Sequence, residues 1–180
     1  YTGLTTSITT EHPDYPALML GMQVLGNPGG FSGRLMKTVR EEEGLTYGIY
    51  TYTSGFSSTI DGYLSVWATF APQLFVQGRA AIAREIGLII VKGVTEAEVK
   101  THREMYDARA RVRLSSSGAL AQAAHTLAAD GRPMSYLDTF SKKILSLHAK
   151  EVNAALQKYL IPALLCESAA GPVEKKDLTS

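Results

Sequence analysis

The stretch spanning residues 25–52 constrains the fold most, because it joins four local patterns without a gap. Residues 26–30 are rich in glycine and contain a proline, which favours a tight turn. Residues 31–42 carry apolar side chains four positions apart and are predicted to form a helix. Gly44 suits the left-handed residue that ends such a helix, and residues 46–52 alternate in the manner of a strand. The sequence therefore places a helix end and a strand start on the two sides of one sharp corner.

Two polar side chains flank this corner. Arg40 lies in the last turn of the predicted helix, and Tyr47 lies at the start of the predicted strand. A guanidinium and a phenol give directed donors for a carbonyl oxygen and for negative charge that develops on it. The residues alone leave an alternative open, in which Arg40 pairs with the carboxylates of residues 41–43 or with solvent and Tyr47 only packs.

Similar patterns predict the other elements of the chain. Glycine and proline residues mark the boundaries between the predicted elements. The predicted helices carry apolar side chains along one face. Strands are expected at 1–10, 46–52, 62–70 and 163–170, and helices at 15–25, 31–42, 73–92, 96–114, 119–129, 136–147 and 149–160. This order predicts an α+β fold, an antiparallel sheet with helices packed on one face.

The length and the net charge of the chain limit how many domains it can form and which classes of partner it can bind. With 180 residues, 45% of them hydrophobic, the chain is expected to form a single domain over 1–172 and a flexible tail over 173–180. The net charge of +1 gives no global field for nucleic acid or an anionic membrane. No apolar run reaches the roughly 20 residues of a membrane-spanning helix, so a soluble protein is expected. The single cysteine, Cys166, leaves bacterial cytoplasm and periplasm both open.

One carboxylate in this sequence resembles a catalytic acid when taken in isolation. Glu98 follows Thr95 by three residues at the start of a predicted helix. That spacing is a capping box, in which the hydroxyl and the carboxylate each accept a hydrogen bond from a helix-terminal amide. Because the spacing accounts for it fully, Glu98 is predicted to be a helix cap.

The sequence lacks the usual metal and nucleophile motifs. The four histidines are His12, His102, His125 and His148, and no two stand at a spacing that shares one zinc ion. There is no serine nucleophile elbow and no phosphate-binding loop. We therefore expect that this chain alone binds no cofactor.

The corner carries a resemblance to a known family. The run Gly29-Gly30-Phe31-Ser32-Gly33-Arg34-Leu35, followed by Arg40-Glu41 and Gly44-Leu45 before Tyr47, resembles the second, non-zinc domain of pitrilysin-type peptidases, the insulinase and mitochondrial-processing-peptidase group. One departure is Gly33, where that family usually has serine. The resemblance covers roughly residues 10–172 and implies the same α+β architecture.

The resemblance also implies a function. In that family, an arginine and a tyrosine seven positions apart bind the substrate carbonyl next to the scissile bond, and Arg40 and Tyr47 match them. Gly29, Gly30 and Phe31 are expected to bind substrate beside them. The zinc, held by an H-x-x-E-H motif, is expected on another domain or on a paralogous subunit, within a homo- or heterodimer that hydrolyses peptides.

A second function is compatible with the same fold. Some relatives resemble this domain yet serve as structural subunits, such as the core proteins of a respiratory complex, in which case no catalysis is expected.

The first residue is Tyr1, within a strand pattern, and we expect the chain to be a piece of a longer polypeptide.

Overall fold

The structure, a computed structural model, describes residues 1–27, 32–57 and 59–172. The predicted tail at 173–180 lies outside the described residues. The strands are β1 (Thr2–Thr5), β2 (Thr46–Ser54), β3 (Tyr63–Phe70) and β4 (Cys166–Glu167). The α-helices are α1 (Tyr15–Leu25), α2 (Phe75–Lys92), α3 (Glu96–Arg113), α4 (Ser117–Ala129), α5 (Ser135–Ser146) and α6 (Ala149–Tyr159). A π-helix, η1 (Met36–Glu42), and two 3-10 turns, η2 (Pro72–Leu74) and η3 (Pro162–Leu164), complete the described elements.

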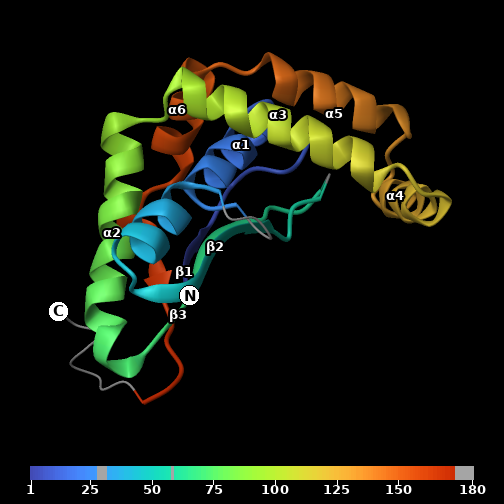
Figure 1. The fold of residues 1–180 in the computed structure, drawn as a ribbon. Coiled ribbons are helices and arrows are strands. Elements are labelled where there is room, and N and C mark those ends of the chain that lie inside the picture. Colours follow the sequence, from blue (N-terminus) through green and yellow to red (C-terminus); the bar gives the residue numbers. More distant parts are fainter. Residues whose placement is uncertain (28–31, 58, 173–180) are drawn as a thin grey trace.

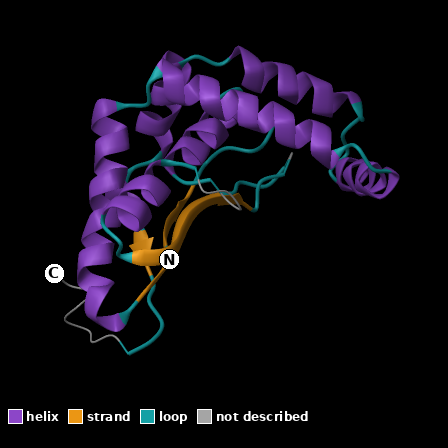
Figure 2. Ribbon diagram, in the orientation of Figure 1, coloured by secondary structure: helices purple, strands orange, loops and turns teal. Residues whose placement is uncertain are grey.

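The strands form one antiparallel sheet in the order β2-β3-β1-β4. Helices α1, α2 and α6 lie on one side of this sheet, and none of the described helices lies on the opposite side (Figures 1 and 2). Helices α3 and α5 run side by side past the end of the sheet, with α4 at their far end (Figure 1). The predicted α+β class, with helices on one face of an antiparallel sheet, is confirmed.

Strand alternation decides which side chains meet the helices. In β3, Leu64 and Val66 are buried in the core, whereas Tyr63 and Thr69 are exposed on the opposite face. The open face is not bare, because Trp67 stacks on Tyr50 of β2 with ring centroids 5.8 Å apart. The hairpin thus has the two-sided character that its period-2 pattern predicts.

Helix α1 is the centre of the core. Its bounds coincide with the predicted ones, and it is apolar on nearly every side because the sheet, α3, α5 and α6 surround it. The absence of a side chain at Gly21 lets α6 approach closely, since a Cβ placed there would lie 2.7 Å from Cγ of Leu156. No helix among the described residues is both long and apolar enough to cross a membrane.

Three predicted elements differ from the observed ones by more than two residues or in helix type. The first strand ends at Thr5 because its partner β3 begins at Tyr63, which stands opposite Thr5. The last strand is reduced to Cys166–Glu167, since Pro162 starts a 3-10 turn in its place. The helix predicted over 31–42 is a π-helix for most of its length.

Candidate functional site

Arg40 lies on a π-helical turn, which is wider than an α-helical one. The amide of Glu43 bonds to the carbonyl of Thr38 at 2.9 Å, five residues back. Gly44 follows with φ +64°, the left-handed stop that the sequence predicts. Single π-helical turns are rare and often occur at functional positions. Because this hydrogen bond spans five residues instead of four, Arg40 leaves the helix in a different direction than it would from an α-helix.

Tyr47 lies on a β-bulge. Thr46 stands opposite Phe70 and Gly48 opposite Thr69, so Tyr47 is the additional residue, with no partner across the strand pair. The hydroxyl of Thr46 supports the bulge, because it accepts a hydrogen bond from the amide of Gly48 at 3.1 Å. Bulges of this kind redirect a side chain away from the sheet, and 88% of Tyr47 is exposed.

The two side chains meet at the predicted corner. Nε of Arg40 donates a hydrogen bond to the backbone carbonyl of Tyr47 at 3.0 Å. The guanidinium carbon of Arg40 lies 5.6 Å from the centroid of the Tyr47 ring. This contact fixes the cation beside the phenol, on the surface at the start of β2. Among the described residues, neither side chain lines the cavities beside Trp67, beside Tyr52 or beside Arg132.

The described residues that flank the glycine-rich segment contact each other and α3. Gly29, Gly30 and Phe31, predicted to bind substrate, lie outside the described residues. Asn27, with 1% of its surface exposed, donates from Nδ2 to Oγ of Ser32 at 3.0 Å. Arg109 of α3 donates to Oδ1 of the same amide at 2.6 Å. The residues on either side of the predicted substrate-binding segment are therefore held together and against α3.

Gly33 has a more specific role than the sequence indicates. Its φ is +112°, a conformation that residues with a Cβ rarely adopt, and a Cβ there would lie 2.9 Å from Cα of Gly26. The sequence suggests only a slightly weaker helix start at this position. The structure shows instead that glycine allows two backbone segments to touch at the base of the turn.

Glu98 forms the helix cap that the spacing predicts. Its carboxylate accepts hydrogen bonds from the amide and hydroxyl of Thr95 at 2.8 and 2.9 Å. Arg34 adds two more, from Nε at 2.7 Å and Nη2 at 2.9 Å, and also donates to the carbonyl of Gly93. Arg34 is part of the 29–35 segment that resembles the peptidase family. It therefore connects the start of the η1 segment to the turn between α2 and α3.

This cap predicts a loss of stability in acid. Burial alone would raise the pKa of Glu98, but hydrogen bonds from Arg34 and Thr95 outweigh burial and lower the pKa to about 2. The unfolded chain therefore binds more protons below about pH 4.5, and the contribution is lost as pH falls towards 2. The Glu98→Gln variant is expected to lose about 1–3 kcal/mol of unfolding free energy at pH 7.

Urea unfolding between pH 7 and pH 2 checks this expectation, with Glu104→Gln, on an exposed position of α3, as the control. The unfolding free energy of Glu98→Gln is expected to decline less steeply below pH 4.5 than that of the parent and the control. Parallel pH profiles for all three proteins would contradict the role of the cap.

The described residues hold no plausible zinc site. No group of three histidine, cysteine, aspartate or glutamate side chains within the described ranges is placed to hold a metal ion. His102 is 95% buried in α3, since its exposed fraction is 5%, and burial lowers the pKa of its imidazole. Because these donors do not fit zinc, no catalytic step is assigned to a metal held by this part of the chain.

Three features of the site could not be recognised from the sequence. The π-helical turn, the bulge at Tyr47 and the bond from Arg109 to Asn27 depend on contacts between separate segments. Only the Thr-Tyr-Gly triplet at 46–48 carries a weak signal, because glycine inside a strand pattern often accompanies a bulge.

Comparisons with known proteins agree with this architecture. Residues 2–106 match the peptidase M16 inactive domain family. An uncharacterized zinc protease of Mycobacterium leprae is 35% identical over 72 residues, which cover 40% of this chain and 16% of the relative. One from Streptomyces coelicolor is 35% identical over 71 residues, covering 39% and 15%.

Two solved structures show the same fold. The peptidase M16 inactive domain of Pseudomonas fluorescens superposes with a TM-score of 0.78 at 26% identity, covering 91% of this chain and 39% of that one. An inactive peptidase domain from Bordetella parapertussis gives a TM-score of 0.80 at 16% identity, covering 97% and 92%.

The fold and the family match together define the class of this protein. It is an α+β domain of the kind found as the non-catalytic part of zinc proteases. The chain belongs to the peptidase M16 family, in which it corresponds to the inactive domain, and the pitrilysin-type resemblance is confirmed. The matched region spans about 16% of the length of the curated relative from Mycobacterium leprae.

Proposed function

We propose that this domain binds peptide substrate beside a zinc centre that another domain or subunit supplies, and that Arg40 and Tyr47 hold the substrate carbonyl next to the scissile bond. The observation that supports this most directly is the convergence of two backbone irregularities. A π-helical turn and a β-bulge bring a guanidinium and an exposed phenol to one corner, where Nε of Arg40 bonds to the carbonyl of Tyr47.

The chemistry of the pair suits this task. The guanidinium stays charged at any working pH and offers donors in a fixed plane. A phenol adds a directed hydroxyl donor. Both donors stabilise a carbonyl oxygen more strongly as negative charge grows on it during attack by water. Zinc on the other domain would polarise the same carbonyl and activate the water.

The packing around the corner supports preorganisation. Arg34, Glu98 and Thr95 tie the start of η1 to α3, and Thr46 holds the bulge. A site whose donors are already in place spends less of its binding energy on ordering them in the transition state. The corner therefore has the rigid support that such a role needs.

Removal of the phenolic hydroxyl tests the proposal. In the complete zinc-loaded enzyme that contains this domain, Tyr47→Phe is expected to lower kcat for peptide hydrolysis by about ten- to a hundredfold, with a smaller change in KM. Tyr52→Phe is the control, because it removes a hydroxyl from an exposed tyrosine of the same strand. Equal rates for both variants and the parent would assign the corner a structural role, like that of an inactive subunit.

A further inference from the structure

The cavity beside Tyr52 has a volume of about 430 Å³ and lies on the open face of the sheet. Its lining includes Ser65 of β3, which follows the core residue Leu64 and therefore points to the open face. Gly3 of β1 and Cys166 of β4 also line this cavity. We call the hollow that these three strands form the Gly3 trough.

Three residues of the trough form one row across the sheet. Ser65 stands opposite Gly3, and Gly3 stands opposite Cys166. The space above Gly3 is open because this residue has no side chain, and a Cβ there would lie 2.6 Å from the carbonyl oxygen of Leu64. The hydroxyl of Ser65 and the thiol of Cys166 therefore stand at the two ends of a bare floor, two strand spacings or about 10 Å apart.

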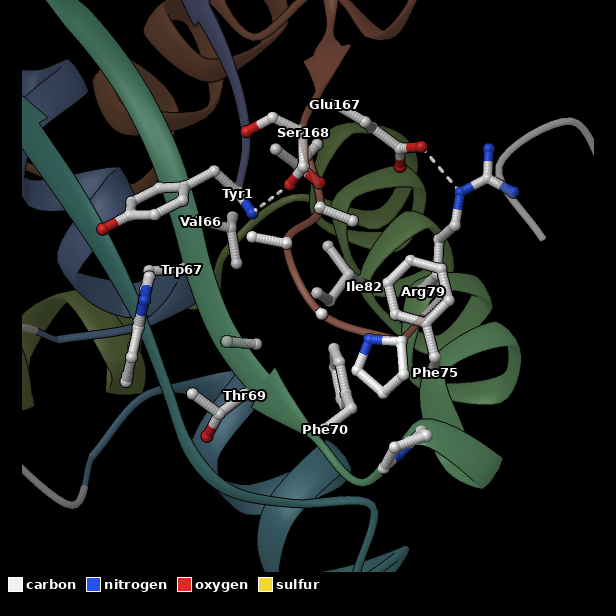
Figure 3. A pocket seen from close by; sticks show the side chains of 17 residues that line it. Tyr1, Val66, Trp67, Thr69, Phe70, Phe75, Arg79, Ile82, Glu167 and Ser168 are labelled. Carbon is white, nitrogen blue, oxygen red and sulfur yellow. Dashed lines mark hydrogen bonds and ion pairs between the residues drawn. The ribbon is translucent and has the colours of Figure 1, made fainter. Parts of the chain in front are cut away.

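Strand alternation places the thiol on this floor. Glu167, the next residue, reaches the opposite face, where its Oε2 pairs with Nε of Arg79 of α2 at 2.6 Å (Figure 3). Successive residues of a strand point to opposite faces, so Cys166 points to the trough. Cys166 is exposed, and its Sγ lies 4.0 Å from the carbonyl oxygen of Leu164, a contact that a weak thiol donor gives up easily. The sulfur is therefore accessible to a ligand.

The other end of the row carries a hydrogen-bond donor that is not used. Only 8% of Ser65 is exposed, and its hydroxyl forms no hydrogen bond with any residue that the structure describes. A buried hydroxyl without a partner is unfavourable, and an acceptor atom on a ligand in the trough would satisfy it. Tyr63, two residues before Ser65 on the same face, adds an aromatic wall.

We propose that the Gly3 trough binds α,β-unsaturated ketones that carry an aromatic group, and that Cys166 adds to them covalently. The ketone oxygen accepts the hydrogen bond from Ser65, and the aromatic group lies against Tyr63. A distance of about 3–3.5 Å between sulfur and the attacked carbon and a hydrogen bond of about 2.7 Å at the oxygen leave about 4 Å of the floor. That remaining length matches a conjugated C=C–C=O unit.

The addition needs no further reactant. The thiolate is the reactive form of a cysteine. Its sulfur forms a bond to the β-carbon of the ketone, the C=C π bond breaks, and that electron pair moves towards the oxygen as an enolate. The hydroxyl of Ser65 stabilises the negative charge on this oxygen. The α-carbon then takes up one proton, which balances the proton that the thiol released to solvent, and no atom leaves.

Two ketones that differ in one group test the proposal. Phenyl vinyl ketone carries an aromatic ring on its carbonyl carbon, and methyl vinyl ketone carries a methyl group there. Labelling of Cys166 in the complete enzyme is followed by mass spectrometry of the peptide that contains it, and each rate is divided by that of N-acetylcysteine with the same ketone. After this correction the phenyl ketone is expected to react about tenfold faster than the methyl ketone.

Three variants show whether this preference comes from the trough. Ser65→Ala is expected to slow labelling by both ketones about tenfold, because the enolate loses its donor. Tyr63→Leu is expected to slow only the phenyl ketone. Thr69→Ala is the control, because it removes a hydroxyl from the same face of β3 at a position that does not line the trough.

Either of two results would overturn the proposal. A corrected ratio of one in the parent protein would mean that Cys166 reacts as any exposed thiol does. Parental rates for both Ser65→Ala and Tyr63→Leu would mean that the trough does not direct the reaction. Neither measurement uses hydrolysis, and Arg40 and Tyr47 do not line the trough, so both stand apart from the test at Tyr47.

Discussion

Replacement of Arg40 by alanine is expected to lower kcat for peptide hydrolysis by about 10²–10³ in the complete zinc-loaded enzyme. The guanidinium would contact the substrate oxygen most strongly in the transition state, so the loss should appear in kcat more than in KM. The same variant removes the bond from Nε to the carbonyl of Tyr47, which leaves the phenol less well oriented. Initial rates over a range of peptide concentrations give both constants.

Two further variants show whether a lower rate comes from the loss of the planar donor set, from the loss of positive charge or from a less stable fold. Arg40→Lys keeps a positive charge but loses the planar donor set, so its rate is expected to stay well below that of the parent. Arg111→Ala is the control, because Arg111 is a largely exposed arginine whose ion pair to Asp107 lies within α3. Parental kcat for Arg40→Ala, with unchanged Tm, would refute the catalytic role of this side chain.

Replacement of Gly33 by alanine is expected to destabilise the domain by about 3 kcal/mol or more. The change forces a residue with a Cβ into φ +112°, which costs about 1–3 kcal/mol in general. The new Cβ would also lie 2.9 Å from Cα of Gly26, a backbone atom that cannot swing away as a side chain end can. For a domain of this size the change corresponds to a fall in Tm of roughly 6–12 °C.

Gly87 gives the matched control, with the opposite sign expected. It lies inside α2 and its φ is not positive, and apart from its chain neighbours and the nearby backbone of its own helix no atom lies within 4 Å of a Cβ placed there. Gly87→Ala should therefore stabilise the protein by about 0.5–1 kcal/mol through helix propensity. Urea unfolding of both variants makes the comparison. A Gly33→Ala protein as stable as the parent would mean that the turn base can relax.

Local rules account for much of what was predicted correctly. The bounds of α1, the capping box of Thr95 and Glu98, and the glycine stop at Gly44 follow from residues within one or two helical turns. The alternation of β3 likewise separated its core face from its open face. In these cases the stabilising partners are close in sequence, so the pattern contains the information.

Contacts between distant segments account for what the sequence left open. Arg34 meets Glu98 across 64 positions, and Arg109 meets Asn27 across 82. Neither pairing produces a periodic pattern in the amino-acid sequence, because each depends on how α3 packs against the segments around it. Gly33 shows the same limit, since its close contact with Gly26 exists only after the turn has closed.

The sequence by itself determined the fold class, the family and the two residues that face each other across the corner. Tertiary structure alone decided the sheet order β2-β3-β1-β4, the π-helical turn beneath Arg40 and the bulge that exposes Tyr47. The physical reason is that helix and strand patterns depend on neighbouring residues, whereas strand pairing and backbone irregularities depend on which surfaces must pack together.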